Sequence, residues 1–278
     1  MIAAINAWTF PPETTPEQRI AEAADAGFDG IELVIGAKEK LTFATPPTAC
    51  AELARRAADL HLQIVSLATA DFWDVNYANP DPQRRQQACD MTLRMLDCAA
   101  ALGAGAILVL PAVVGLPDEP RGRVVYADAL SRGLDALCRL RHEAEARGVT
   151  IAVENVLSRF LLSPVEFADF IDRVNSGCVG AYLDVGNVVP IGDPEDWIRT
   201  LDYRIARVHV KDYDLSQSGP AARVPLGEGS VNWPSVIAAL RQIGYDGPLT
   251  CEDDGDPRAI RRRLAKILDT ESAEGGCE

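Results

Sequence analysis

The chain has 278 residues, 47% of them hydrophobic, and its 41 acidic and 27 basic side chains give a formal net charge of −14 at pH 7. This charge argues against a nucleic-acid-binding protein and against attachment to anionic membrane surfaces, since both need a basic face. No apolar run approaches the length of a membrane span, and the N-terminal segment MIAAINAWTF lacks the basic residues of a signal peptide.

The seven cysteines indicate the cellular compartment. They are scattered at positions 50, 89, 98, 138, 178, 251 and 277, and none forms a C-x-x-C pair. An odd number of scattered cysteines predicts free thiols rather than a disulfide framework. We therefore expect a cytoplasmic protein, because thiols stay reduced in that compartment.

Short apolar runs with the β-branched content of buried strands alternate along the chain with helical segments. Several helix ends carry the expected signals: Thr15, Asp81 and Ser163 are predicted N-caps, and Gly103 and Gly148 follow C-terminal ends. In chain order, the predicted strand–helix pairs are 2–6 and 16–26, 30–35 and 47–60, 63–67 and 82–102, 106–110 and 124–147, 149–154 and 164–174, 179–184 and 194–201, 205–209 and 233–243, and 248–252 and 257–268.

This alternation predicts the α/β fold class and, within it, a single (β/α)₈ TIM barrel. Eight strand–helix units of about 35 residues each match the usual size of that barrel. We expect the barrel to cover residues 1–270 and residues 271–278 to form a disordered tail. The alternative, a doubly wound open sheet, usually has a Gly-rich phosphate-binding turn after its first strand, whereas here the sequence AWTFP follows.

Four of the predicted strands end in a residue that can bind a metal or move a proton. The runs VTIAVE, VGAYLD, IARVH and PLTCE end at Glu154, Asp184, His209 and Glu252, respectively. Active sites of TIM barrels lie at the carboxyl ends of the strands, so these side chains are predicted to converge. Strand periodicity supports this orientation, because it turns the apolar residue before each of them toward the helices.

Three carboxylates and one imidazole form an oxygen-rich ligand set. Such a set suits Mn²⁺, and also Mg²⁺ or Co²⁺, better than Zn²⁺, which prefers thiolates and histidines in structural sites. Four protein ligands leave two positions of an octahedral ion open, which fits the carbonyl and neighbouring hydroxyl oxygens of a ketose. The ion would polarise the carbonyl and stabilise an enediolate. Glu154 and Glu252, on well-separated strands, would then remove and return the proton.

Further residues near these strand ends are candidates for the same site. Lys211 lies one pleat beyond the imidazole and is predicted to stabilise an oxyanion, although Lys211-Asp212 could also be an exposed ion pair. Asn187 is either a turn residue or a group that supports the ligands and substrate. Trp8 and Trp73 follow the first and third strands, where they either pack within loops or form an apolar wall over a sugar.

Several stretches resemble the sugar phosphate isomerase/epimerase family, whose members have a xylose-isomerase-like TIM barrel. The resemblance covers most of the chain and is greatest to members described as ketose-phosphate 3-epimerases or hexulose-phosphate isomerases. The stretches are ATADFW (68–73), DPQRRQ (81–86), VENVLSRFLLSP (153–164), VGAYLDVGNVV (179–189), RIARVHVKDYD (204–214) and GYDGPLTCEDD (244–254).

The resemblance implies one divalent metal ion bound by the four strand-end residues named above. It also implies that Glu154 and Glu252 act as the proton-transfer pair, and that Arg223, just before the sequence PLG, binds substrate. Relatives often have a histidine at the position of Asn187, so an additional proton relay is not implied here. The segment 213–229 is predicted to be a lid or specificity loop.

Two hypotheses for the activity share the same first step. The first is a metal-dependent isomerase or epimerase of a ketose or ketose phosphate. The alternative is a metal-dependent dehydratase or lyase that acts on a keto-cyclitol or 3-oxo sugar after the same proton abstraction. Both expect a small-molecule sugar as the partner, and both leave a homo-oligomer open.

Two other classes fit less well. A DNA-repair endonuclease with this barrel needs a His-rich, multi-zinc site and a basic surface, whereas this chain has three histidines and a net charge of −14. A non-catalytic sugar-binding protein has no need of two acid/base glutamates.

Overall fold

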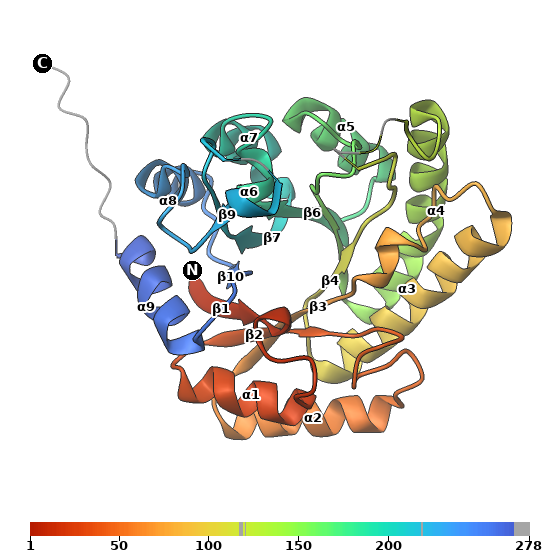
Figure 1. Ribbon diagram of the computed structural model, residues 1–278. Helices are drawn as coiled ribbons and strands as arrows, with labels where there is room; N and C mark the ends of the chain where they lie inside the picture. The colour runs from red at the N-terminus through yellow and green to blue at the C-terminus, as the bar shows by residue number, and fades with distance from the viewer. Residues whose placement is uncertain (117–118, 120, 218, 270–278) are drawn as a thin grey trace, which may run out of the picture.

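The computed structural model describes residues 1–269 apart from 117, 118, 120 and 218. In this part of the chain, eight parallel strands close into a barrel that helices surround (Figure 1). The predicted TIM barrel is therefore confirmed, whereas the predicted tail at 271–278 lies outside the described residues. The barrel strands are β1 (Ile2–Asn6), β2 (Gly30–Val34), β3 (Gln63–Ala68), β4 (Ala106–Val109), β5 (Thr150–Glu154), β6 (Val179–Asp184), β7 (Ile205–Val210) and β10 (Pro248–Cys251).

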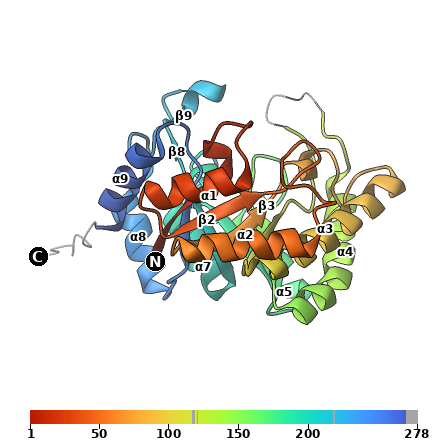
Figure 2. The same ribbon diagram turned by 90° about the horizontal axis from the view of Figure 1, so that it is seen from below.

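The helices that follow the strands cover the outside of the barrel. They are α1 (Pro16–Asp25), α2 (Pro47–Asp59), α3 (Pro82–Leu102), α4 (Tyr126–Arg147), α5 (Pro164–Val174), α7 (Pro194–Leu201), α8 (Trp233–Gln242) and α9 (Pro257–Leu268). Figure 2 shows α1 and α2 side by side over β2 and β3. Within the described residues, no helix is long and apolar enough to cross a membrane.

The helix boundaries follow from the predicted capping residues. Thr15 forms a reciprocal capping box with Gln18 at the start of α1, and Ser163 accepts the Glu166 N–H at the start of α5. Gly103 ends α3 in the left-handed region with φ of 69°, a conformation that costs glycine little because it has no Cβ. These local signals mark where those three helices begin or end.

The order of strands around the barrel is β1-β10-β7-β6-β5-β4-β3-β2, so β5, β6, β7 and β10 are consecutive neighbours. Side chains alternate between the barrel interior and the helices. Val153, Leu183 and Val208 are fully buried against the helix layer, as the periodicity predicts. The polar residues next to them in sequence therefore point into the barrel.

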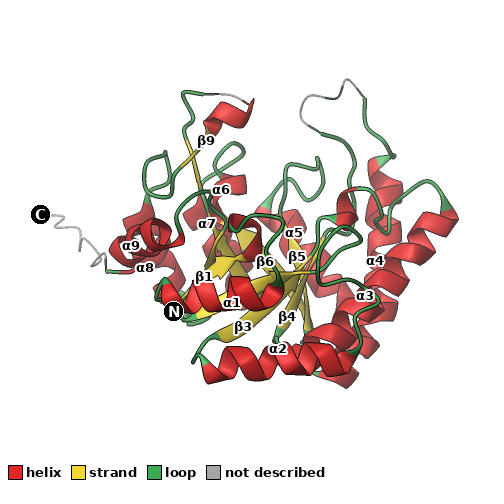
Figure 3. Ribbon diagram, turned by 60° about the horizontal axis from the view of Figure 1, so that its bottom comes forward, coloured by secondary structure: helices red, strands yellow, loops and turns green. Residues whose placement is uncertain are grey.

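Several short elements of the structure are absent from the sequence prediction. A single helical turn, α6 (Val185–Val188), follows β6 directly, and a small antiparallel hairpin joins β8 (Asp212–Tyr213) to β9 (Arg223–Val224). The hairpin lies within the segment predicted as a loop, and Figure 3 shows β9 rising above the barrel. Each hairpin strand has only two residues, too few for a period-two pattern to be recognised.

The close packing of β2 against β3 gives a testable prediction about stability. A Cβ added at Gly30 would lie 2.6 Å from Val65 Cγ1 and 3.2 Å from the Gln63 carbonyl oxygen. Gly30→Ala should therefore destabilise the fold by about 1–3 kcal/mol, measured by urea unfolding. Gly177→Ala is the matched control, because nothing lies within 4 Å of the added Cβ. Equal stability of the two variants would contradict this packing.

Candidate metal centre

The carboxyl ends of four neighbouring strands bring together the four residues singled out from the sequence. Glu154 ends β5, Asp184 ends β6, His209 lies near the end of β7, and Glu252 follows β10. One potential ligand atom from each lies within 4.8 Å of the other three. The strand register brings two of these residues together, because Asp184 pairs with His209 across β6 and β7.

The imidazole of His209 is the centre of this cluster. Its Nδ1 atom lies 3.0 Å from Glu154 Oε1, 3.9 Å from Asp184 Oδ2 and 3.8 Å from Glu252 Oε2. Its ring also packs against that of Tyr182 at a tilt of 45°, with the centroids 4.2 Å apart. Nδ1 and the three carboxylates therefore face one common point.

Burial disfavours ionised carboxylates in this cluster unless a cation lies nearby. Asp184 and His209 are fully buried, and the positive charge nearest to Asp184 Oδ2 among the described residues is the Lys211 ammonium, 2.8 Å away in an ion pair that lacks hydrogen-bond geometry. The other carboxylate oxygen of Asp184, Oδ1, accepts the N–H of Asn187 at 2.9 Å. Buried carboxylate oxygens need a hydrogen bond or a positive charge, so the arrangement fits a divalent ion coordinated by oxygen and imidazole ligands.

Lys211 faces the same point from one pleat further along the chain. Its ammonium lies 2.8 Å from Asp184 Oδ2 and 3.0 Å from Glu252 Oε2. Asp212 points elsewhere and accepts hydrogen bonds from three backbone N–H groups and from the indole of Trp233. The alternative interpretation of Lys211 and Asp212 as an exposed ion pair is therefore wrong, because both side chains are buried and serve different partners.

The two candidate proton-transfer groups differ in electrostatic environment. Burial raises the pKa of Glu154 more strongly than the neighbouring His209 lowers it. Burial also opposes ionisation of Glu252, but the charges of Lys211, His209 and Arg223 outweigh it and lower the pKa of that carboxyl group. The same barrel mouth thus holds two glutamates with opposite tendencies to carry a proton.

A buried carboxylate that the sequence analysis missed lies behind His209. Glu32, in the middle of β2, is fully buried, and its Oε1 atom lies 2.7 Å from His209 Nε2. Gly30, Glu32 and Val34 share one face of the strand, which is the interior of the barrel. A glutamate in the middle of an apolar strand could have identified Glu32 from the sequence, because a buried charge requires a partner.

Two asparagines hold the segment that carries Asp184. The side chain of Asn155 accepts the Asp184 N–H at 2.7 Å and donates to the Asp184 carbonyl oxygen at 2.9 Å. Asn187 is buried, and its amide donates to the Asn155 carbonyl oxygen at 2.9 Å. These contacts orient the segment that follows β6. Asn187 itself lies in α6, one helical turn away from the cluster.

The hairpin places Arg223 beside Glu252. The Arg223 guanidinium donates to the Glu252 carbonyl oxygen at 2.9 Å and lies 3.9 Å from its Oε1 atom. Its buried Nε atom has no hydrogen-bond partner among the described residues. An unpaired buried N–H next to the cluster is suited to a substrate oxygen.

Trp8 and Trp73 lie in short 3-10 helices after β1 and β3, and both are partly buried. The other two histidines, His61 and His142, are exposed on the surface, as expected. Neither of them contributes to the cluster.

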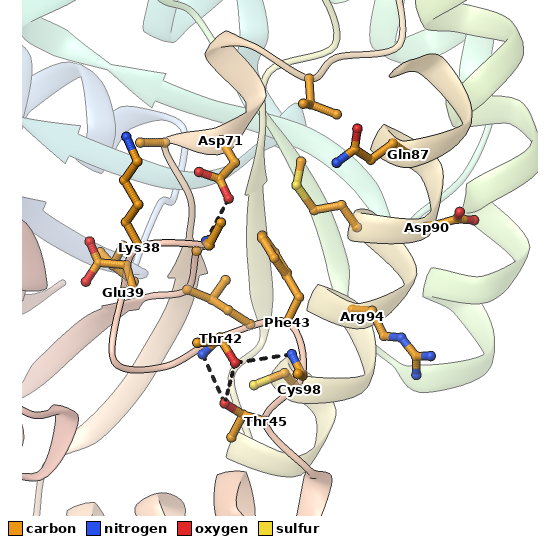
Figure 4. A pocket seen from close by; sticks show the side chains of 18 of the residues that line it. Lys38, Glu39, Thr42, Phe43, Thr45, Asp71, Gln87, Asp90, Arg94 and Cys98 are labelled. Atoms are coloured by element: carbon orange, nitrogen blue, oxygen red, sulfur yellow. Dashed lines mark hydrogen bonds between the residues drawn. The ribbon is translucent and has the colours of Figure 1, made fainter. Parts of the chain in front are cut away.

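A separate groove of about 1020 Å³ lies beside the barrel (Figure 4). It is formed by the segment between β2 and α2 and by one face of α3. Asp71 at its edge accepts the Ala37 N–H at 2.9 Å, and Thr42 and Thr45 hydrogen-bond to one another. None of the four cluster residues lines this groove, so it is distinct from the candidate metal centre.

Comparison with known proteins places the chain in a family. Residues 20–270 match the model of the family described as Xylose isomerase-like TIM barrel, and the chain belongs to that family. The resemblance inferred from the sequence is thereby confirmed.

Several relatives are described as epimerases. A 2-epi-5-epi-valiolone 7-phosphate 2-epimerase from Actinoplanes sp. is 26% identical over 85% of this chain and 81% of its own length. An L-ribulose 3-epimerase from Methylomonas sp. is 28% identical over 84% of this chain and 76% of its own length. Among solved structures, a D-psicose 3-epimerase in the presence of D-fructose superposes with a TM-score of 0.79, covering 97% of this chain and 100% of its own at 19% identity.

Proposed function

We propose that this protein is a divalent-metal-dependent isomerase or epimerase of a ketose or ketose phosphate. The observation that carries the proposal is the cluster of Glu154, Asp184, His209 and Glu252, whose ligand atoms lie within 4.8 Å of one another at the barrel mouth. Relatives described as epimerases of a phosphorylated cyclitol and of L-ribulose support the substrate class.

The donor set indicates which metal the site would take. Three carboxylates and one imidazole favour Mn²⁺, with Mg²⁺ and Co²⁺ as alternatives and Zn²⁺ as a poorer match. When bound, such an ion polarises the substrate carbonyl and stabilises the negative charge that proton removal creates.

The two glutamates are positioned to exchange the proton. Glu154 and Glu252 belong to β5 and β10, which are separated around the barrel by β6 and β7. A sugar held between them presents one face to each carboxylate. One glutamate removes the proton next to the carbonyl, and the other returns a proton, either on the opposite face or at the neighbouring carbon.

Two of the remaining candidates, Lys211 and Arg223, lie next to Glu252. Lys211 carries a buried positive charge next to Asp184 and Glu252 and is suited to stabilise a developing oxyanion. Arg223 offers an unpaired N–H beside Glu252. We assign substrate contacts to Arg223, Asn187, Trp8 and Trp73, the tryptophans forming an apolar wall for one face of the sugar.

Removing either proton-transfer group should abolish turnover while the fold persists. Glu154→Gln and Glu252→Gln should each lower kcat by about 10²–10⁴-fold, because an amide cannot accept the substrate proton. Glu22→Gln, at an exposed position of α1, is the control and should retain full activity. Circular dichroism would verify folding, and undiminished turnover in both site variants would refute the assignment.

The charge of Lys211 should matter more for the reaction than for binding. Lys211→Ala should reduce kcat by about 10²–10³-fold, as loss of an oxyanion-stabilising donor does elsewhere. KM should rise much less, because the interaction strengthens only when negative charge develops. Steady-state kinetics with the epimerised ketose would measure both. A rise in KM with unchanged kcat would assign Lys211 to ground-state binding instead.

A proton-exchange screen tests the reaction class directly. Mn²⁺-loaded protein would be incubated in D₂O with ketoses, ketose phosphates, inososes and 3-oxo sugars, and the products followed by NMR after removal of the metal. We expect deuterium at the carbon next to the carbonyl, together with an isomeric sugar. A dehydrated or cleaved product would assign the protein to the lyases. A protein that binds metal but exchanges no proton with any of these sugars would contradict the proposed substrate class.

A further inference from the structure

Glu32 is a buried carboxylate next to the cluster that faces away from the common point of the ligands. It lies in the middle of β2, fully buried, on the far side of the His209 ring. A buried charge without partners is costly, so the contacts of the Glu32 carboxylate indicate its role.

Both oxygens of Glu32 are fully engaged. Oε1 lies 2.5 Å from Asn6 Nδ2 and 2.7 Å from His209 Nε2. Oε2 accepts hydrogen bonds from Ser66 Oγ at 2.7 Å and from the Tyr182 hydroxyl at 2.9 Å. The side chain therefore has four partners and no freedom to turn away from the imidazole.

The partners come from separate strands of the barrel, so the backbone register holds the carboxylate. Asn6 pairs with Glu32 across β1 and β2, and Glu32 pairs with Ser66 across β2 and β3. Tyr182 reaches in from β6 on the opposite side of the barrel. His209 is thus held against a carboxylate that the barrel itself immobilises.

This contact determines which nitrogen of His209 can bind a metal. An ionised carboxylate only accepts hydrogen bonds, so the Nε2 atom facing Glu32 must carry a hydrogen. In the neutral ring the lone pair then resides on Nδ1, the atom that faces Glu154, Asp184 and Glu252. A carboxylate behind a metal-binding histidine fixes its tautomer and ring orientation and increases its basicity.

We infer that Glu32 is a positioning residue that presents His209 Nδ1 to the metal and strengthens its bond to the ion. This inference rests on the metal site of the proposed function. It assigns a role to a residue that contacts neither the ion nor the substrate.

The test is the affinity for Mn²⁺ measured by isothermal titration calorimetry, without any substrate. Glu32→Gln retains the shape of the side chain, and its amide oxygen can still accept from Asn6 and His209. Its NH₂ group can donate to the hydroxyls of Ser66 and Tyr182, which also accept hydrogen bonds. We expect a folded protein that binds Mn²⁺ about 10–100-fold more weakly, since only the negative charge is lost.

The matched control is Ser66→Ala. It removes one hydrogen bond to Glu32 Oε2 but leaves the contact between Glu32 and His209 in place. It should lower the unfolding midpoint in urea while leaving the Mn²⁺ affinity close to that of the wild type. If Glu32→Gln binds Mn²⁺ as tightly as the wild type, or if both variants lose affinity equally, the positioning role is refuted.

A second measurement needs no variant. Imidazole ¹⁵N–¹H spectra of the wild-type, Mg²⁺-loaded protein report the tautomer of each of its three histidines. His61 and His142 are exposed and serve as internal references. We expect His209 to carry its hydrogen on Nε2, and a hydrogen on Nδ1 would overturn the inference. Wild-type protein that binds no divalent ion would refute the metal site itself, whereas metal binding with unaltered Glu32→Gln affinity would refute only the role of Glu32.

Discussion

The structure depends on the burial of four carboxylates around one histidine. Glu32 lies on one side of the His209 imidazole, and Glu154, Asp184 and Glu252 lie on the other. Ionised carboxylates repel one another strongly in a low-dielectric interior, so this cluster requires positive charge nearby. Lys211 supplies part of it, and a divalent ion at the common point of the ligands would supply the rest. The gathering of these carboxylates inside the barrel thus accounts both for their burial and for the expected affinity of the site for a cation.

The barrel makes this arrangement possible because it collects residues that are distant in the sequence. His209 and Glu32 are 177 positions apart, yet closure of the barrel brings their side chains to 2.7 Å. Alternation along each strand turns polar groups inward and leaves apolar groups to pack against helices. The same scaffold carries the β8–β9 hairpin, which brings Arg223 beside Glu252 from outside the barrel. The barrel thus gathers the four strand-end residues, and an added hairpin places Arg223 beside them.

The sequence could predict the features that depend on one strand at a time. Strand ends of a parallel barrel share one rim, so a carboxylate or imidazole at the end of a strand has a predictable location, and Lys211 follows from its spacing of two from His209. Glu32 lies in mid-strand, and its partners are fixed only when the barrel closes. The hairpin strands have two residues each, and the Asp212 carboxylate ties them to the following segment by accepting the N–H groups of Tyr213, Gly227 and Val231.

Binding of one divalent ion among the strand-end residues can be observed in a crystal structure of Mn²⁺-loaded protein with anomalous diffraction. We expect one anomalous peak per chain at the barrel mouth, within bonding distance of the carboxylates of Glu154, Asp184 and Glu252 and of Nδ1 of His209. Lys211 would then share its two carboxylates with the ion. A peak at another place, or a barrel mouth where Lys211 alone bridges Asp184 and Glu252 at saturating Mn²⁺, would contradict this expectation.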